Sequence, residues 1–410
     1  MSGPAATVLP FEEARARVEE CARSVAATEP EPVELARAGG RVLVEALVAD
    51  RDFPPFPRSA RDGYAVRAAD VARVPVKLKV TGESKAGAAP GEVPAQLHSG
   101  EAVLIMTGAP ASDGADAVVM VEYTSRDGNV VEIQKSAAVG ENIVPRGSEG
   151  RAGDVLLESG QRLDAAGVAV AASVGKASVL VHSLPRVAIL ATGDEIVDAA
   201  SVPGPNQIRN SNSYSIAAQV RAAGGLPVLL PIAPDEPEQL RRLIEQGLQS
   251  DLLLLAGGVS MGKYDLVEQV LGELSAEFFF TGALIQPGRP VVFGRARGKY
   301  FFGLPGNPVS TMVTFELFAR PVLEALGGAK PRPLAFFPVR LEREIKVRTG
   351  LTRFLPGLLA GQFGELEVKL ASWQGSGDIA GAARANCYVV VPPDRARIAP
   401  GETVAVWIKN

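Results

Sequence analysis

The chain has 410 residues, of which 47% are hydrophobic and 21% are charged, and its formal net charge is −4. This length and composition exclude a disordered protein and predict a soluble globular one with two to four domains and a large hydrophobic core. The basic residues are spread along the chain without a long basic run, so nucleic-acid binding is not expected.

Cysteine and histidine are too scarce to support several kinds of site. Cys21 and Cys387 are far apart and lie in no metal-ligand spacing, so neither a disulfide framework nor a zinc site is expected. Neither His98 nor His182 lies beside a plausible nucleophile or partner in sequence, so a histidine base is not expected and carboxylates or a metal-bound water are the candidates for proton transfer. The N-terminus lacks the features of a signal peptide and no segment has the length and apolarity of a membrane span, so we expect a cytoplasmic protein without membrane partners.

The N-terminal region predicts a helix followed by a rigid extended segment. Apolar residues recur at helical spacing from Phe11 to Ala27, whereas residues 41–47 are compatible with a strand or a short helix. The prolines within residues 54–57 then enforce an extended path. They lead to the pair Asp62-Gly63, which is either an ordinary hairpin turn or a carboxylate presented to a partner or substrate.

Residues 76–144 contain short β-prone runs separated by Gly and Pro, and they predict a small β-rich domain inserted into the N-terminal region. The runs are Val76–Val80, Ala102–Met106, Ala117–Val121 and Val130–Gln134. Thr107 follows the second run and provides a hydroxyl beside flexible backbone, although a plain turn explains it about as well. The Ala- and Val-rich segment Leu163–Ser178 predicts a buried helix that returns to the N-terminal body.

From Arg186 the pattern alternates between strand and helix, which predicts a parallel sheet with helices on both faces. The expected strands are Val187–Ala191, Val228–Ile232, Leu252–Leu255 and Tyr300–Gly303. Three helices are expected: one that begins near Ser211 to Ser213, one over Pro237–Gln249 and one over Val309–Leu326. The strand from Leu252 is continuously apolar, so it should be central and buried on both faces. Ligands of such sheets bind at the carboxyl ends of the strands.

Two glycine turns follow strands of this sheet, and a third loop lies between them. The first turn spans Gly257–Asp265, and its candidate binding residues are Gly257, Gly258, Val259, Ser260 and Gly262. The second turn spans Gly303–Pro308, and its candidates are Pro305, Gly306, Asn307 and Pro308. The loop Gln286–Pro290 adds Pro287, Gly288 and the cation Arg289. Glycine lets a ligand approach the main chain, and Asn307 and Pro308 are suited to start a helix whose free N-terminus favours a phosphate. Each loop alone is better explained as an ordinary turn, but three in one domain favour an anion-binding site.

Four carboxylates fall at the same strand ends: Asp194, Glu195, Asp235 and Asp265. Carboxylates beside phosphate-binding turns repel the ligand unless a divalent cation lies between them, so the sequence predicts Mg²⁺. Asp235 is also suited to cap the helix that follows it and Asp194 to a turn, which makes Glu195 and Asp265 the preferred metal ligands.

The pattern changes again after Lys330, where alternating or apolar runs predict a compact all-β terminal domain. The runs are Pro338–Val347, Glu365–Ala371, Tyr388–Val391 and Val404–Ile408. Ser376-Gly377-Asp378 lies on one of the loops, where these residue types indicate only a turn.

Taken together, these motifs resemble the molybdopterin molybdenumtransferases, a family of molybdenum-insertion enzymes related to the E domain of gephyrin. The matching motifs are Ser59–Ala65 around Asp62, Ile105–Pro110, Arg146-Gly147, Thr192–Glu195, Asn210–Asn212, Gly257–Asp265, Pro287-Gly288 with Pro290, and Gly303–Ser310. They span most of the chain in one order. The chain departs from the family pattern at Glu149, Ala256 and Gln286.

The resemblance implies a multidomain α/β and β protein that forms a homodimer. Domain I is a helical and β body of residues 1–50 and 145–182, domain II is the β-rich insert 51–144, domain III is the αβα molybdopterin-binding domain 183–329, and domain IV is a barrel-like β domain, 330–410. Domain III has a parallel-rich sheet, and the active cleft is expected between domain III of one subunit and domain II of the other.

The resemblance also implies a Mg²⁺-dependent reaction in which adenylylated molybdopterin and molybdate give molybdenum-molybdopterin and AMP. The implied catalytic residues are Asp62, Thr107, Glu195, Asp235 and Asp265, and the loop residues given above, together with Ser310, are implied to bind the cofactor precursor. Arg289, with Arg209 as a second candidate, is expected to help retain molybdate. A molybdopterin adenylyltransferase acts one step upstream and is the expected functional partner.

Two other interpretations stay open. One is a non-catalytic molybdopterin-binding scaffold or carrier, since gephyrin also organises receptors, although such a scaffold is expected to carry a long linker and a further upstream domain. The other is the upstream adenylyltransferase, whose fold is similar to domain III alone and which needs neither the N-terminal half nor the β tail.

Overall fold

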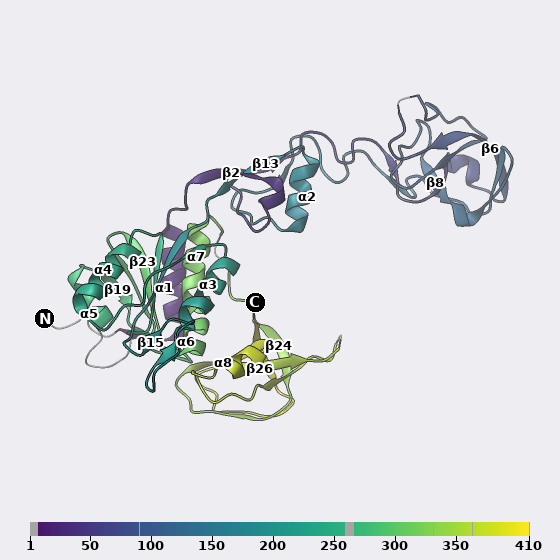
Figure 1. Ribbon diagram of the computed structural model, residues 1–410. Helices are drawn as coiled ribbons and strands as arrows, with labels where there is room; N and C mark the ends of the chain where they lie inside the picture. Colours follow the sequence, from purple (N-terminus) through teal and green to yellow (C-terminus); the bar gives the residue numbers. More distant parts are fainter. Residues whose placement is uncertain (1–6, 90, 259–265, 331, 363, 410) are drawn as a thin grey trace.

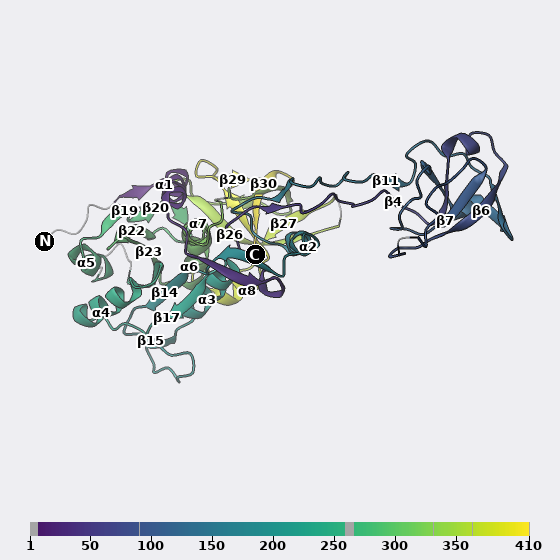
Figure 2. The same ribbon diagram turned by 90° about the horizontal axis from the view of Figure 1, so that it is seen from above.

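The computed structural model describes residues 7–89, 91–258, 266–330, 332–362 and 364–409. The molecule is elongated: an α/β body and a β-barrel lie together, a small lobe projects from them, and a six-stranded β domain occupies the far end (Figures 1 and 2). Within this described part, no helix combines the length and the apolarity that crossing a bilayer requires.

The α/β body is built on a six-stranded sheet with the order β17-β14-β18-β23-β22-β19. Its strands are β14 (Arg186–Ala191), β17 (Leu226–Leu229), β18 (Leu252–Ala256), β19 (Glu277–Phe280), β22 (Val292–Ala296) and β23 (Lys299–Leu304). The strands β17, β14, β18 and β23 run parallel, and β22 runs antiparallel to both of its neighbours, β23 and β19. The predicted parallel-rich sheet, with β18 at its centre, is therefore confirmed.

Helices cover both faces of this sheet, as the alternating pattern predicts. They are α3 (Asn212–Ala222), α6 (Pro308–Thr314), the π-helical turn η4 (Phe315–Ala319) and α7 (Arg320–Leu326) on one face, and α4 (Pro237–Gly247) and α5 (Leu266–Glu273) on the other. Leu252 and Leu254 of β18 pack into the first core, and Leu253 and Leu255 pack into the second. Because successive strand residues point to opposite faces, a strand buried on both sides has to be apolar throughout.

One predicted strand of this body is misplaced. The strand expected at Val228–Ile232 is β17, which starts two residues earlier and pairs with β14 only as far as Leu229. Pro231 explains the early end, because proline has no main-chain N–H to donate to a neighbouring strand.

The helix α1 (Phe11–Ser24) packs on the α/β body, although its sequence position groups it with domain I. Its buried side chains join the core formed by α3, α6 and α7, and the preceding β1 (Val8–Leu9) pairs with β20 (Gly282–Ala283). The Phe11 ring lies edge-on to Phe318 of the body and to Phe354 of the barrel, with centroid distances of 6.2 and 5.2 Å. The N-terminal helix thus connects these two parts of the molecule.

The C-terminal region is a closed five-stranded barrel with a short helix. Its strands, in spatial order, are β26 (Thr352–Ala360), β27 (Glu367–Leu370), β24 (Phe337–Leu341), β30 (Thr403–Ile408) and β28 (Cys387–Val391), which pairs again with β26. The prediction of an all-β domain is wrong at α8 (Ile379–Arg384), where the Asp378 side chain accepts from the Gly381 N–H at 2.8 Å and caps the helix. Outside the barrel, β25 (Ile345–Lys346) pairs with β29 (Arg397–Ile398).

The inserted domain is a six-stranded sheet with the order β8-β5-β7-β6-β10-β9, as its short β-prone runs predict. Its strands are β5 (Gly63–Val66), β6 (Val76–Ser84), β7 (Glu101–Ile105), β8 (Ala117–Met120), β9 (Thr124–Asp127) and β10 (Val130–Ile133), and 3₁₀ turns occupy Ala68–Val71 and Val121–Tyr123. The pair β4 (Arg58–Ser59) and β11 (Ile143–Val144) joins the domain to the lobe, and an ion pair of 2.8 Å between Arg58 and Glu149 lies beside it.

The lobe is small and its helix is more exposed than predicted. It consists of β2 (Pro30–Glu34) paired with β13 (Ser178–His182), β3 (Leu47–Val48) paired with β12 (Val155–Leu157), a 3₁₀ turn at Leu35–Arg37, and α2 (Ala165–Ser173). The helix predicted at Leu163–Ser178 is shorter, and only Gly167 and Ala171 of it are buried, because α2 packs against the lobe on one side only.

The interpretation of Asp62-Gly63 as a hairpin turn is wrong. Gly63 opens β5, which pairs with β7 and β8, whereas the preceding β4 pairs with β11. A Cβ atom on Gly63 would lie 2.0 Å from the carbonyl oxygen of Val119, so the glycine permits close strand packing. Asp62 therefore lies on an exposed loop at the start of this domain's sheet.

Candidate active site

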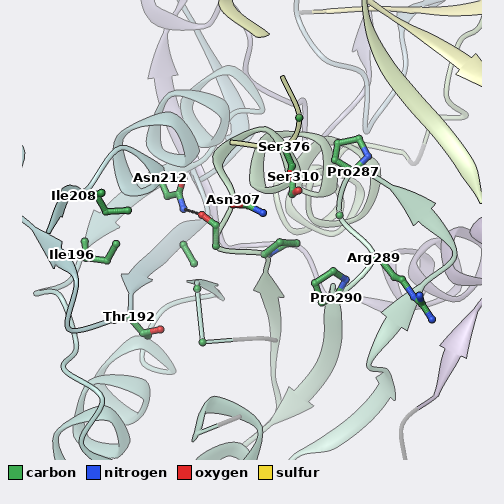
Figure 3. A pocket seen from close by; sticks show the side chains of 18 of the residues that line it. Thr192, Ile196, Ile208, Asn212, Pro287, Arg289, Pro290, Asn307, Ser310 and Ser376 are labelled. Atoms are coloured by element: carbon green, nitrogen blue, oxygen red, sulfur yellow. Dashed lines mark hydrogen bonds between the residues drawn. The ribbon is translucent and has the colours of Figure 1, made fainter. Parts of the chain in front are cut away.

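A large cavity lies at the carboxyl ends of the parallel strands and has a volume of about 1120 Å³. Its lining includes, from the α/β body, Thr192, Gly193, Glu195, Ile196, Ile208, Asn212, Asp235, Gly257, Gly258, Gln286, Pro287, Gly288, Arg289, Pro290, Pro305, Gly306, Asn307 and Ser310 (Figure 3). The prediction that these strand ends gather their loops in one place is confirmed. Val259, Ser260, Gly262 and Asp265 lie outside the described residues.

The two glycine turns meet at the wall of this cavity. A Cβ atom on Gly306 would lie only 3.6 Å from the Cα atom of Gly257, so the main chains of the two turns are close neighbours. The Asn212 side chain donates to the Gly306 carbonyl at 2.7 Å, and the Thr311 hydroxyl donates to the carbonyl of Pro305. Helices α3 and α6 thus hold the second turn from both sides, so its shape is set before any ligand arrives.

The expected free helix N-terminus is partly occupied. Pro308 is the first residue of α6 and Asn307 precedes it as predicted, but the Asn307 side chain forms no capping bond. The main-chain N–H of Val309 donates to the carbonyl of Ser376 in the barrel at 3.0 Å. An anion at this turn would therefore meet fewer free N–H groups of α6 than the sequence implied.

Two of the four predicted carboxylates line the cavity. Glu195 and Asp235 both face it. The predicted cap by Asp235 is wrong, since α4 begins after Glu236 and has no side-chain cap; instead the Asp235 N–H donates to the Asp194 carboxylate at 3.0 Å. No group of three His, Cys, Asp or Glu residues within the described ranges is arranged to hold a metal ion.

The loop that carries Arg289 is fixed by the barrel. The strand β21 (Ile285–Gln286) pairs with Thr352 and Arg353 at the start of β26 and leads directly into Pro287. Arg289 borders the cavity, but its side chain is exposed and extends away from Asn212 and Asn307 (Figure 3). Arg209, the second candidate for molybdate, donates from Nε to the Ser201 carbonyl at 2.9 Å.

Asp62 and Thr107 are brought together, but in the inserted domain at the far end of the molecule (Figure 1). The Asp62 Oδ1 atom accepts from the Thr107 N–H at 2.6 Å and from the Thr107 hydroxyl at 2.8 Å. These two donors, the N–H first, lower the pKa of the Asp62 carboxyl below its ordinary value. Within one chain, these two residues do not line the cavity that contains Glu195.

Sequence reasoning missed the contribution of the barrel to the cavity. Leu351, Trp373, Gly375 and Ser376 line it, although the local sequence around Ser376 indicates only a turn. It also missed that two residues of the cavity lining have buried side-chain oxygens without a hydrogen-bond partner in the described chain, Thr192 Oγ1 and Asn212 Oδ1. No local pattern reveals either feature, because both depend on contacts between distant segments.

Three family models match consecutive parts of the chain. They are the MoeA N-terminal region (domain I and II) at residues 9–175, a probable molybdopterin binding domain at 188–325, and the MoeA C-terminal region (domain IV) at 338–409.

Individual relatives agree with these models. The chain is 36% identical to the molybdopterin molybdenumtransferase of Nostoc sp. over 386 residues, which is 92% of this chain and 88% of the relative. It is 32% identical to the molybdopterin molybdenumtransferase of Haemophilus influenzae, over 92% of this chain and 94% of the relative. The solved molybdopterin biosynthesis MoeA protein of Pyrococcus horikoshii aligns over 98% of this chain and all of its own, with 28% identity and a TM-score of 0.76.

Proposed function

Because the chain belongs to the MoeA family of molybdopterin molybdenumtransferases, we propose that it inserts molybdate into adenylylated molybdopterin and releases AMP. Membership of this family makes it a transferase of molybdenum cofactor biosynthesis. The observation that best supports the specific reaction is the meeting of two glycine turns and two carboxylates in one cavity at the strand ends.

The cavity residues suit a substrate with a phosphoanhydride. The turns at Gly257 and Gly306 would bind the phosphates through the main chain, because neither residue has a side chain to keep them away. Glu195 would orient a water molecule toward the phosphoanhydride; the water adds across that bond, AMP leaves and the pterin keeps its own phosphate. The two dithiolene sulfurs of the pterin would then replace one oxide of molybdate, which leaves as water with the two thiol protons, and Arg289 would turn toward the cavity to retain the molybdate dianion.

The carboxylates that line the cavity fit a magnesium ion bound together with substrate. Mg²⁺ at phosphate sites is commonly bound by one or two carboxylates and by the phosphates themselves, so a full protein cage is not required. Glu195 and Asp235 would hold it, and the ion would offset the charge of the phosphates. Asp265, the other predicted ligand, stays a prediction.

We further propose that the complete site forms in a homodimer, between the cavity of one subunit and the inserted domain of the other. Asp62 accepts two hydrogen bonds from Thr107 on exposed loops of the inserted domain, which lies at the far end of the molecule from the α/β body (Figure 1). A second copy related by two-fold symmetry would bring this pair to the cavity, and the same contact would complete the other site.

We also propose that the protein acts one step after a molybdopterin adenylyltransferase, which would supply the adenylylated pterin. A cytosolic location for both proteins agrees with the two free, buried cysteines.

The first experiment is to measure AMP release from adenylylated molybdopterin after molybdate and Mg²⁺ are added. Release should depend on molybdate and should fall by about 100-fold in Glu195→Ala, which loses a group that acts on the reacting phosphate. Circular dichroism would show that the variant is folded. A wild-type protein that binds the adenylylated pterin but never releases AMP would instead be a scaffold or carrier.

Mixed dimers test the shared site. Asp62→Ala and Glu195→Ala should each be inactive as homodimers. After the two variants are unfolded and refolded together, random pairing would restore roughly a quarter of wild-type activity, because half of the dimers contain one site with neither substitution. If the mixture stays inactive although heterodimers are present, the site does not combine these residues from two chains.

A further inference from the structure

The Asn212 side chain, in the wall of the cavity, has a buried hydrogen-bond acceptor without a partner in the described chain. Asn212 is the first residue of α3 and lines the cavity, and its Nδ2 atom donates to the Gly306 carbonyl at 2.7 Å. A carbonyl oxygen can only accept, so this bond fixes which end of the amide faces Gly306. The Oδ1 atom is left buried and without a partner in the described chain.

An unpaired buried acceptor is costly, and Asn212 is not needed to cap α3. The N-terminus of α3 is already stabilised by Asn210, whose Oδ1 accepts from the Ser213 N–H at 3.1 Å. Leaving a buried acceptor unpaired costs about 1–3 kcal/mol, so such atoms call for an explanation such as a ligand.

The wall beside Asn212 is apolar and unusually exposed. Ile196 of β15 (Ile196–Val197) and Ile208 of β16 (Ile208–Arg209) are paired residues of two short parallel strands, and both line the cavity next to Asn212 (Figure 3). Ile208 is 57% exposed, which is high for an isoleucine in the lining of a cavity. Two aliphatic side chains beside one acceptor suit a flat ring that carries an N–H donor at its edge.

We propose that Ile196, Ile208 and Asn212 form a subsite for a fused nitrogen heterocycle, and that Asn212 Oδ1 accepts a hydrogen bond from the amino group of this ring. The inference rests on the proposed function, whose substrate has such a ring at each end: adenine and the pterin. Because the Oδ1 atom is buried, a neighbouring side chain would have to move aside for the ring to reach it, and Ile208 is exposed and would be free to rotate.

This subsite would set the orientation of the substrate. The glycine turns recognise phosphate through the main chain, and a phosphoanhydride looks similar from either end. An acceptor that selects an amino group distinguishes the two ends. Asn212 also touches Gly306, so the same amide links recognition of the ring to the position of the phosphate turn.

The test uses two pairs of ligands that differ in the amino group. Binding of AMP is compared with that of purine riboside 5′-monophosphate, which lacks the 6-amino group, and binding of pterin with that of 4-hydroxypteridine, which lacks the 2-amino group. Isothermal titration calorimetry on the full-length wild type should show that one amino ligand binds about tenfold more tightly than its analogue, since the acceptor stays unpaired with the analogue.

Variants then assign this preference to Asn212. Asn212→Ala should reduce the ratio of affinities to about one, because the acceptor is gone. Thr311→Val is the matched control: it removes the bond to the Pro305 carbonyl at the same turn but leaves Asn212, so it can weaken both ligands of a pair while their ratio is kept. Ile208→Ala should weaken both ligands equally, and Val202→Ala, 89% exposed on the same segment and outside the cavity lining, should change neither.

Each outcome either supports or overturns the proposed subsite. A preference for AMP that depends on Asn212 assigns the subsite to adenine, and a preference for pterin assigns it to the pterin. A wild type that prefers neither amino ligand or binds none at millimolar concentration, or a preference that survives in Asn212→Ala, overturns the inference. Molybdate-dependent AMP release is measured separately, so insertion activity without the preference refutes the subsite alone, and the preference without insertion activity refutes the proposed reaction alone.

Discussion

Gly306→Ala should weaken ligand binding without destabilising the protein. Gly306 lines the cavity and does not adopt a left-handed backbone conformation, and an added Cβ atom would meet only the Gly257 Cα at 3.6 Å, an ordinary van der Waals contact. The free energy of unfolding should therefore change by less than about 0.5 kcal/mol. The new methyl group would stand between the two turns, where a phosphate has to approach the main chain, and it should lower the affinity for AMP by about tenfold or more.

Gly258→Ala is the matched variant, and unlike Gly306→Ala it should destabilise the protein. Gly258 has a φ of +67°, and its added Cβ atom would lie 2.6 Å from both Thr192 Oγ1 and Val267 Cγ2. The left-handed backbone costs a residue with a side chain about 1–2 kcal/mol. Overpacking against two branched side chains costs about 1–3 kcal/mol more. The two effects together should lower the free energy of unfolding of the α/β body by about 2–5 kcal/mol.

Urea unfolding followed by tryptophan fluorescence measures both variants. Trp373 borders the cavity and Trp407 packs where the barrel meets the α/β body, so the emission reports on this region. AMP affinity is measured by calorimetry under native conditions. The account of the turns is refuted if Gly306→Ala binds AMP as tightly as the wild type, or if it unfolds as readily as Gly258→Ala.

Three further predictions concern other parts of the molecule. Thr107→Val removes the hydroxyl donor to Asp62 and keeps the N–H donor, so the lowered pKa of Asp62 should rise toward its ordinary value. A carboxyl NMR titration measures this pKa, and an unchanged midpoint contradicts the prediction. The sign follows from linkage: the stabilisation by ionised Asp62 is complete above the pKa of the unfolded chain, about 3.9, and is lost as pH falls through the lower folded value. Glu195→Gln keeps the size of the side chain but removes its charge, so AMP release should need at least about tenfold more Mg²⁺; the same Mg²⁺ dependence as in the wild type would remove Glu195 from the metal site. Phe11→Ala should lower the free energy of unfolding by about 3–5 kcal/mol, because a nearly buried ring is lost from between the α/β body and the barrel. Phe336→Ala, at a site that is 39% exposed, should lower it little. Equal urea midpoints for the two variants would contradict the role of α1 in connecting body and barrel.

The parts of the fold that sequence predicted well are those determined by local pattern. The uninterrupted leucines of β18 require burial on both faces, and the structure distributes them alternately between two cores. The alternation of strand and helix then fixes the direction of the neighbouring strands, which places Gly193, Gly257 and Pro305 at one edge of the sheet. The location of the cavity follows from these facts alone.

The parts that sequence could not predict depend on contacts between distant segments. The nine-residue strand β26 contains Pro356 and Gly357, which argue against a central strand. In the barrel, the Pro356 carbonyl still accepts from Ala371 at 2.8 Å, and neighbouring residues pair with β28. The amphipathic pattern of α1 likewise predicts a helix, but it does not show which part of the molecule the helix packs on, because any apolar surface could cover its apolar face.

The second glycine turn shows why its neighbours matter as much as its own residues. Thr311 holds the Pro305 carbonyl from α6, Asn212 holds the Gly306 carbonyl from α3, and the carbonyl of Ser376 in the barrel takes the first free N–H of α6. Turns of this composition bend in many ways, so these three contacts select one shape and prepare it for an anion. A substitution in the barrel that moves Ser376 should therefore alter phosphate binding in the α/β body, although the two segments lie about 70 residues apart in the chain.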